Sequence, residues 1–256
     1  MGVMTDNTAS APLLEAKQVT VKFEGLAALE DVDLVLKEHE ILGFIGPNGA
    51  GKTTFVNTLT GFQRVTTGQV FLEGDEVTNV AAHRLARRGV ARTFQGAHLF
   101  AGLTVLENIE ASGVGVGGSR RESRRRAWQI LEQMGRGDLA HVPAGSLPHG
   151  EERRLGMARA LVTHPKVLIL DEPAAGLNES ESDELLGTIS GWSREYGCSI
   201  LLIEHDMRLI MRLCDRVQVI DHGKTIAVGT PGEVRADDAV IEAYLGRKRS
   251  GANAGG

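Results

Sequence analysis

One stretch of the sequence decides the fold, 40-EILGFIGPNGAGKTT-54. Its first half is a short apolar run of the kind that forms a strand buried on both faces of a parallel sheet. Its second half, Gly46–Thr53, fits G-x-x-x-x-G-K-[ST] and leads into a helical pattern that runs to Leu59. Such a loop between strand and helix surrounds a phosphate with backbone N–H groups and adds the positive end of the helix dipole. The stretch therefore predicts a site for a nucleotide phosphate.

A second segment, 166-KVLILDEP-173, is predicted to contribute to the same site, because two carboxylates follow its apolar strand. Charged groups in that position need a partner, which favours a site over a solvated strand end. We predict that Lys52 reaches the β- and γ-phosphates of ATP and that Thr53 is a ligand of Mg²⁺. Asp171 is expected to hold the same Mg²⁺, directly or through a water, and Glu172 to orient or deprotonate the attacking water.

Composition limits the classes of protein that the chain can belong to. With 256 residues, 42% of them apolar, it can bury one large domain, or one domain with a subdomain. A net charge of −5 argues against a nucleic-acid partner held by bulk electrostatics, and an aromatic content of 4% argues against base-stacking platforms. Cys198 and Cys214 lack the spacing of metal ligands, so we predict buried thiols of a reducing compartment.

The sequence contains no apolar run of the ~20 residues that a membrane-spanning helix needs. Its start, MGVMTDNTASAP, lacks the basic end and apolar region of a secretory signal. We therefore expect a cytoplasmic protein, and any membrane span must come from another chain. Residues 1–12 and 247–256 are small and polar and are predicted to be flexible tails around a domain at 13–246.

Apolar runs at 40–49, 166–173 and 198–206 alternate with helical patterns at Thr53–Leu59, Glu181–Trp192 and Met207–Leu213. This alternation predicts a doubly wound α/β domain of the P-loop NTPase type with a mostly parallel sheet. Runs with more polar alternation predict added antiparallel strands at Leu14–Phe23, Val32–Leu36, Gln69–Glu73, Arg216–Ile220 and Lys224–Val228. Helical patterns without a clear strand at about 96–165 predict a helical subdomain inserted into the α/β core.

Six segments occur in a diagnostic order: GPNGAGKTT, RTFQ, LPHGEERRL, LILDEP, AGLN and LLIEHD. From about residue 14 to residue 246 the chain resembles the nucleotide-binding subunit of an ATP-binding cassette (ABC) transporter. It looks most like the ATP-binding subunits of branched-chain amino acid importers. The features behind this narrower resemblance are DEPAAGLN (171–178), LLIEHDM (201–207) and AVIEAYLG (239–246).

The resemblance implies roles for residues at matching positions. Phe23 is expected to stack on the adenine, Gln95 to lie near Mg²⁺ and the attacking water, and His205 to bond the γ-phosphate. Asn178 is expected at a subunit interface where the family often has Asp, so hydrogen bonding is kept and the charge is lost. The residues implied to hold ATP in the loop are Gly46, Asn48, Gly49, Ala50, Gly51, Lys52, Thr53 and Thr54. The implied metal ligands are Thr53, Gln95 and Asp171, and the implied catalytic residues are Glu172, His205 and Gln95.

The family signature Leu-Ser-Gly-Gly-Gln is replaced by Leu147-Pro148-His149-Gly150-Glu151. In the family, two subunits close head to tail, and the signature helix of each contacts the ATP of its neighbour. We therefore expect Leu147, His149, Gly150 and Glu151 to act on the neighbour's nucleotide. Proline suits a first helical turn but offers neither a hydroxyl nor an N–H. His149 either donates to that phosphate in place of serine or packs against the neighbour.

The resemblance implies an ATPase that powers an importer for branched-chain or other hydrophobic amino acids. Its expected partners are membrane permease subunits at the inner face of the cell membrane, a second ATP-binding subunit, identical or different, and indirectly a periplasmic binding protein. The odd signature motivates the hypothesis of a different second subunit. The alternatives are a lipid-exporting ABC system and a soluble ABC ATPase that acts on DNA or ribosomes. The basic run Ser119–Trp128 is either a solvated helix face or a contact for anionic lipid.

Overall fold

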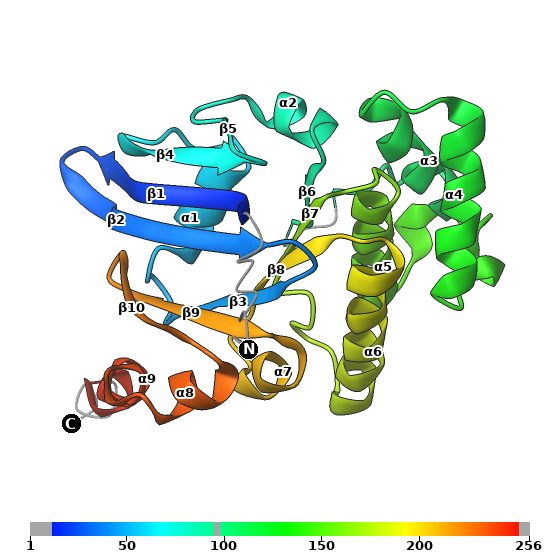
Figure 1. Ribbon diagram of the computed structural model, residues 1–256. Helices are drawn as coiled ribbons and strands as arrows, with labels where there is room; N and C mark the ends of the chain where they lie inside the picture. The colour runs from blue at the N-terminus through cyan, green and yellow to red at the C-terminus, as the bar shows by residue number, and fades with distance from the viewer. Residues whose placement is uncertain (1–11, 95–97, 251–256) are drawn as a thin grey trace, which may run out of the picture.

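The computed structural model describes residues 12–94 and 98–250 (Figure 1). Its centre is a six-stranded sheet in the order β10-β9-β3-β8-β7-β6. Every neighbouring pair is parallel except β10 and β9. The strands are β3 (Ile41–Ile45), β6 (Val90–Arg92), β7 (Val167–Asp171), β8 (Ser199–Ile203), β9 (Arg216–Asp221) and β10 (Lys224–Gly229). All residues of β3, β7 and β8 are buried, as their apolar sequences predict.

Both faces of this sheet are covered, because successive side chains of a strand point to opposite sides. Ile200 and Leu202 of β8 belong to the same apolar cluster as residues of α6 (Glu179–Glu195) and α5 (His149–Leu161). Leu201 and Ile203 belong to the cluster that contains α1 (Lys52–Leu59). The remaining helices of the strand-rich part are α2 (Ala82–Arg87), α7 (Met207–Leu213), α8 (Pro231–Ala236) and α9 (Asp238–Ser250).

A second, antiparallel sheet lies on the α1 side in the order β2-β1-β4-β5. Its strands are β1 (Pro12–Phe23), β2 (Leu26–Lys37), β4 (Thr67–Leu72) and β5 (Asp75–Glu76). Its inward residues share one core with α1 and β3, where Phe55 stacks on Phe44 with ring centroids 5.0 Å apart. The helix that follows the glycine-rich loop is therefore held between two sheets.

A helical lobe stands apart from the two sheets (Figure 1). It contains α3 (Val105–Gly115), α4 (Arg120–Gln133), the short 3₁₀ helices η1 (Gly137–Leu139) and η2 (Ala144–Ser146), and α5. Helix α3 begins with a capping box between Thr104 and Glu107. Helix α5 contacts α3 and α4 on one side and β6 and β7 on the other, so it connects the lobe to the central sheet.

The structure corrects three details of the predicted fold. Strand β9 was expected to be antiparallel, but it pairs in parallel with β3, because the crossover through α7 returns the chain in the same direction. The strands β5 and β6 were not predicted, since each has three residues or fewer. Helix α9 continues through Ser250, into the segment that was predicted to be a tail. Among the described residues, no helix has the length and apolarity that crossing a membrane demands.

A candidate nucleotide site at the ends of the parallel strands

The glycine-rich loop has the geometry of a phosphate cradle. Gly51 adopts a left-handed φ of 107° immediately before α1, and Gly49 has a φ of 80°. A Cβ on Gly46 would lie 2.2 Å from the carbonyl oxygen of Ile220, so only glycine fits there. Around Gly49 a Cβ would meet no atom within 4 Å, which leaves the backbone at the tip of the loop accessible. Gly46 is therefore required by the fold, and Gly49 lies where a ligand can approach.

Lys52 is 9% exposed, and its ammonium group lies inside the loop. Nζ donates to the carbonyl oxygens of Gly46 at 2.6 Å and Pro47 at 3.0 Å. The first turn of α1 has no acidic residue and no side-chain cap, so its N–H groups suit an anion. These features fit a phosphate. Of the other predicted loop residues, Asn48 and Thr53 are exposed, Thr54 is half-buried and Ala50 is buried.

Asp171 lies at the level of the loop, because Phe44, Ile203 and Asp171 occupy one row across β3, β8 and β7. Its carboxylate is buried, and Oδ2 lies 2.7 Å from Nη2 of Arg92. Its backbone N–H donates to Oγ1 of Thr93 at 3.1 Å. The structure thus places this carboxylate at the strand ends, beside the phosphate cradle.

Glu172 has a left-handed backbone, with a φ of 48°. Its N–H donates to the carbonyl oxygen of Ile203 at 2.9 Å, which fixes this turn. Conformations of this kind are unfavourable for glutamate and gather at functional sites. His205 follows the neighbouring strand, and its Nδ1 lies 4.0 Å from Oε1 of Glu172. Two of the predicted catalytic residues are therefore neighbours, whereas the third, Gln95, lies outside the described residues.

Glu204, which precedes His205, was missed by the sequence reasoning. It is 2% exposed, and its two oxygens accept the N–H groups of Ala174 at 3.0 Å and His205 at 3.3 Å. Burial raises the pKa of this carboxyl, and the two N–H donors oppose the rise. One carboxylate therefore ties the segment after Glu172 to the segment that carries His205. A charged residue directly after the apolar run 199–203 was the available signal.

Replacing Glu204 with Gln is expected to reduce the free energy of unfolding by about 1–3 kcal/mol, because the amide places an NH₂ donor against one of the two N–H groups. The pH dependence also has a definite sign. Since the folded pKa is raised, wild-type stability falls as pH rises from the ordinary glutamate pKa through the folded one, whereas Gln does not titrate. Urea unfolding of both proteins across that pH range measures both effects. Equal stabilities with equal pH slopes would show that the two bonds are not important.

Phe23, expected to stack on adenine, ends β1 and is 47% exposed. It pairs with Leu26 in the turn between β1 and β2. The same hairpin touches the loop, because a Cβ on Gly51 would lie 2.8 Å from the carbonyl oxygen of Ala28. The aromatic ring is therefore carried by a hairpin that lies against the cradle.

The replaced signature begins α5, with Pro148 as its N-cap residue. His149 is 83% exposed, and its Nδ1 lies 2.8 Å from Oε2 of Glu152. A carboxylate only accepts, so Nδ1 carries the proton, and Nε2 of a neutral ring is then an acceptor. His149 can donate to a phosphate through Nε2 only as an imidazolium. Leu147 packs against the core, and Gly150 lies against Leu177.

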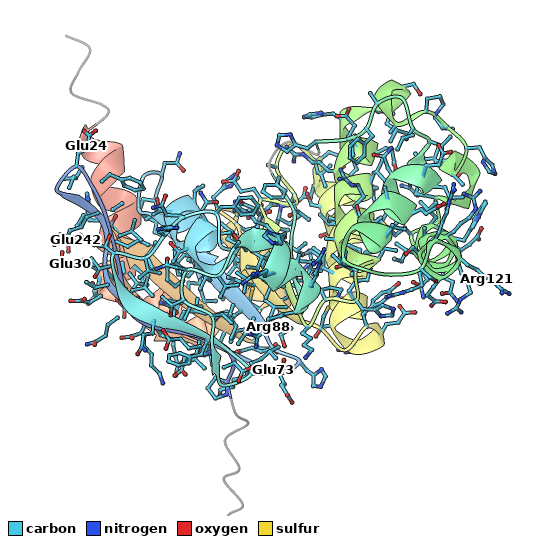
Figure 2. The ribbon with its side chains drawn as sticks, turned by 90° about the horizontal axis from the view of Figure 1, so that it is seen from above. Glu24, Glu30, Glu73, Arg88, Arg121 and Glu242 are labelled. Atoms are coloured by element: carbon cyan, nitrogen blue, oxygen red, sulfur yellow. The ribbon has the colours of Figure 1, made fainter. Side chains whose placement is uncertain are left out.

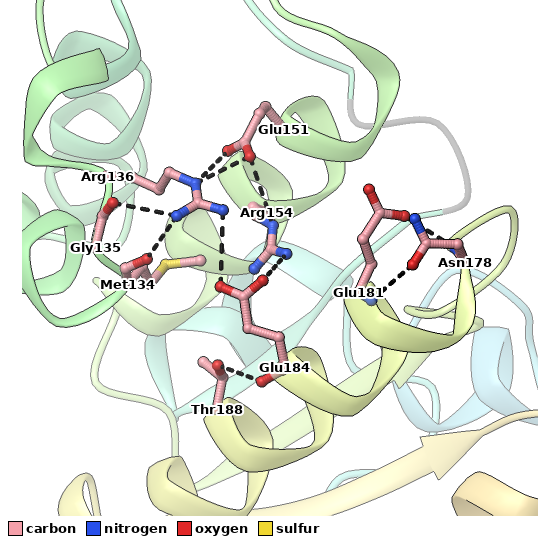
Figure 3. Close-up of polar contacts among 9 residues, drawn as sticks. All are labelled: Met134, Gly135, Arg136, Glu151, Arg154, Asn178, Glu181, Glu184 and Thr188. Atoms are coloured by element: carbon pink, nitrogen blue, oxygen red, sulfur yellow. Dashed lines mark hydrogen bonds and ion pairs between the residues drawn. The ribbon is translucent and has the colours of Figure 1, made fainter.

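The carboxylate of Glu151 is engaged within its own chain (Figure 3). Its oxygens accept from Nε of Arg136 at 2.9 and 3.0 Å, and one lies 3.7 Å from Nε of Arg154. Arg154 also donates to Glu184 of α6 at 2.9 Å. This network ties the lobe, α5 and α6 together. We predicted that Glu151 contacts the nucleotide of a neighbouring subunit. In this structure its carboxylate is already bound by two arginines, which compete with such a contact.

Asn178 caps α6 (Figure 3). Its Oδ1 accepts the N–H of Glu181 at 2.9 Å, and its own N–H donates to Oε2 of Glu181 at 2.9 Å. Capping requires an acceptor and not a charge, and Asn and Asp are equally good N-caps. The structure therefore gives a local reason why Asn can stand where the family often has Asp.

We expect Asn178→Ala to lower the free energy of unfolding by about 1 kcal/mol, because it removes the N-cap acceptor. The free energy of unfolding of Asn178→Asp should lie within a few tenths of a kcal/mol of the wild-type value. Denaturant melts of the two variants measure this difference. A stable alanine variant would show that the capping box does not stabilise α6.

The basic run is used largely within the helical lobe. Arg120 and Arg124 of α4 both bind the buried Glu110 of α3, at 2.6 and 2.8 Å. Arg125 binds Glu122, and Arg126 is buried. Arg121 projects from the outer surface of the lobe (Figure 2). This arrangement favours a structural role for the run over a patch for anionic lipid.

Both cysteines are free and buried, as predicted. Burial raises the pKa of Cys198 to about 11 and that of Cys214 to about 12. Neither thiol therefore ionises at neutral pH.

Comparison with known proteins agrees with this geometry. Residues 29–175 match the model of the ABC transporter family, and residues 224–249 match that of the branched-chain amino acid ATP-binding cassette transporters. The chain is 41% identical over 252 residues to the high-affinity branched-chain amino acid transport ATP-binding protein BraF of Pseudomonas aeruginosa, which covers 93% of this chain and 99% of BraF. It is 42% identical over 254 residues to LivG of Escherichia coli K12, with the same coverage.

Solved structures give the same result. A nucleotide-free ATP-binding cassette from an ABC transporter superposes with a TM-score of 0.83 and 28% identity, over 91% of this chain and 99% of that one. The ADP conformation of an ATP-binding cassette from an ABC transporter superposes with a TM-score of 0.84 and 29% identity, over 93% of this chain and 100% of that one. The predicted fold class and family are thereby confirmed. A phosphate cradle, an inserted helical lobe and an acidic strand end follow one another along the chain, and with these matches they show that it belongs to the ATP-binding cassette family of ABC transporters and is an ATPase.

Proposed function

We propose that this ATPase powers an importer for branched-chain or other hydrophobic amino acids from the cytoplasmic face of the membrane. The observation that carries the proposal is the match of residues 224–249 to branched-chain amino acid cassettes. This segment forms β10, α8 and α9, outside the nucleotide site, so it separates transporter types that share the same ATPase core. Lipid exporters and soluble ABC ATPases are less well supported, because no feature of the described chain points to them specifically.

Within the site, the loop and Lys52 bind the phosphates of ATP. Thr53 on α1 and Asp171 on β7 offer the oxygen donors that Mg²⁺ prefers, with Gln95 as the third proposed ligand. When bound, Mg²⁺ supplies positive charge to the phosphate oxygens. Glu172 accepts the proton of the attacking water, and His205 lies beside it to donate to the γ-phosphate.

A second ATP-binding subunit is proposed to complete the site, with the signature end of α5 facing the nucleotide of the partner. The support is geometric, because His149 is largely exposed at the N-terminus of a 13-residue helix. Proline at the serine position leaves this end with one donor fewer. We therefore favour a different partner with its own signature, which makes the two nucleotide sites unequal.

The permease is proposed to contact a groove of about 640 Å³ between the helical lobe and the strand-rich part. Phe62 and Phe94 line it, 58% and 41% exposed, with ring centroids 5.5 Å apart in an edge-to-face pair. Exposed aromatic pairs of this kind are typical anchors of protein interfaces. The groove also borders Asp171 through Arg92, so a partner seated there is close to the nucleotide site.

Reconstitution tests the function. The protein is assembled in vesicles with the permease subunits and the binding protein of a branched-chain amino acid importer, and uptake of leucine, isoleucine and valine is measured with ATP inside. ATP-dependent uptake that is lost with Glu172→Gln is the expected result. ATPase activity stimulated by lipid substrates or by ribosomes, without amino acid uptake, would refute the importer and support one of the alternatives.

A further inference from the structure

Arg92 makes an unusual set of contacts next to the nucleotide site. It ends β6, beside β7 (Figure 1), and its side chain is 7% exposed. Nη2 donates to Oδ2 of Asp171 at 2.7 Å, and Nη1 donates to Oδ1 of Asn57 at 2.5 Å. The guanidinium also lies over the ring of Phe94, with Cζ 5.0 Å from the centroid. Both terminal nitrogens of the planar group are therefore bonded, and an aromatic ring covers one of its faces.

The two bonded partners lie on the two elements that carry the proposed Mg²⁺ ligands. Asp171 is itself one ligand, at the end of β7. Asn57 lies one turn after Thr53 on α1, four residues along, so the two side chains share a face of the helix. Arg92 thus bridges α1 and β7, the two elements that carry Thr53 and Asp171.

We propose that Arg92 is a positioning residue that fixes the spacing and orientation of Thr53 and Asp171 for Mg²⁺. The inference rests on the proposed ATP–Mg²⁺ site. The bond uses Oδ2 of Asp171, which orients the carboxylate and leaves Oδ1 for the metal. A guanidinium can hold two acceptors with a rigid fork, whereas the ammonium of lysine is a point charge that cannot hold both in that geometry.

If Arg92 instead hindered the metal, its replacement would change the Mg²⁺ affinity in the opposite direction. A cation 2.7 Å from a metal ligand repels the metal, so an arginine that merely occupied Asp171 would weaken Mg²⁺ binding. Arg92→Lys keeps the positive charge and alters the fork, so it isolates geometry from repulsion. Asn57→Ala keeps the ion pair and removes only the bridge to α1.

The test measures binding and not hydrolysis. Affinity for the non-hydrolysable analogue adenylyl-imidodiphosphate is determined by calorimetry, first in EDTA and then in increasing Mg²⁺. For Arg92→Lys we expect metal-free affinity to stay at the wild-type value and the apparent Mg²⁺ affinity to fall by about 10- to 100-fold, as for other residues that orient metal ligands. Asn57→Ala should change the Mg²⁺ affinity in the same direction by a smaller factor.

Arg216→Lys is the matched control. Arg216 binds the buried Glu40 at 2.8 Å. Glu40 lies just before β3, so this ion pair is at the end of the sheet opposite the nucleotide site. Arg216→Lys should leave the Mg²⁺ dependence unchanged, and thermal melts of all variants show whether each is folded. Unchanged or increased Mg²⁺ affinity in folded Arg92→Lys would overturn the proposal. If the nucleotide affinity of the wild-type protein did not depend on Mg²⁺, the proposed metal site would be refuted, and the role of Arg92 with it.

Discussion

Replacing Glu172 with Gln is expected to lower the rate of ATP hydrolysis by about 10²- to 10⁴-fold, the usual contribution of a positioned general base. Affinity for ATP should not change, because Gln keeps the size of the side chain and the phosphates are held by the loop. The backbone of residue 172 already has a φ of 48° and is fixed by its bond to Ile203. The variant is therefore expected to retain the fold of the site and to lose only the proton acceptor.

Single-turnover hydrolysis and equilibrium binding of ATP separate the two effects. Glu73→Gln is a matched control, because Glu73 also has a left-handed backbone, with a φ of 54°. It lies on the surface (Figure 2), and its carboxylate binds Lys166 at 2.6 Å. Its activity should equal that of the wild type. If Glu172→Gln hydrolysed ATP at the wild-type rate, another group would have to accept the proton.

The same variant addresses the partner subunit. A chain that binds but does not hydrolyse ATP should remain closed against a second subunit, so its mass in solution reports whether two identical copies pair. The structure gives each copy the same reduced signature, with His149 held by its own Glu152. A Glu172→Gln protein that stayed monomeric with ATP, and paired only with a different ATPase, would support unequal sites.

Local rules were sufficient to predict the cradle and the three buried strands of the central sheet. The loop can be read from Gly46 to Thr53 because the glycines serve a local backbone need, confirmed at Gly46 by its contact with Ile220. The three buried strands are apolar throughout because both faces are covered. The ends of parallel strands meet at one edge, so Asp171 could be expected near the loop although it lies more than 100 residues away.

The polar contacts that complete the site could not be predicted in this way. Arg92 and Asp171 are 79 residues apart, and Glu204 and Ala174 are 30 residues apart. No local pattern selects such partners, since the pairing follows from which strands are adjacent and how long each loop is. Glu151 shows the same limit, because its arginine partner Arg136 belongs to the segment after α4. By contrast, the capping box of Asn178 is local and could have been read from its spacing to Glu181.

Replacing Lys52 with Ala is expected to weaken ATP binding by at least about 30-fold, equivalent to about 2 kcal/mol for a desolvated charge–charge contact. Lys52 is 9% exposed, and its ammonium is held inside the loop by the carbonyl oxygens of Gly46 and Pro47, so little ordering is needed when a phosphate binds. Lys166→Ala is the control, since its exposed ammonium binds only a surface carboxylate among the contacts described for it.

Titration with ATP and with adenosine distinguishes this role from general damage. Adenosine has no phosphate, so the wild type and Lys52→Ala should bind it with the same affinity. Their affinities for ATP should differ, with the weaker binding in Lys52→Ala. Loss of both would mean that the alanine variant has disrupted the loop, whose carbonyl oxygens lose their donor. Lys52→Arg then tests the charge by itself, because it keeps the positive charge and changes the shape of the group. ATP affinity that stays at the wild-type value in folded Lys52→Ala would contradict the central role assigned to this residue.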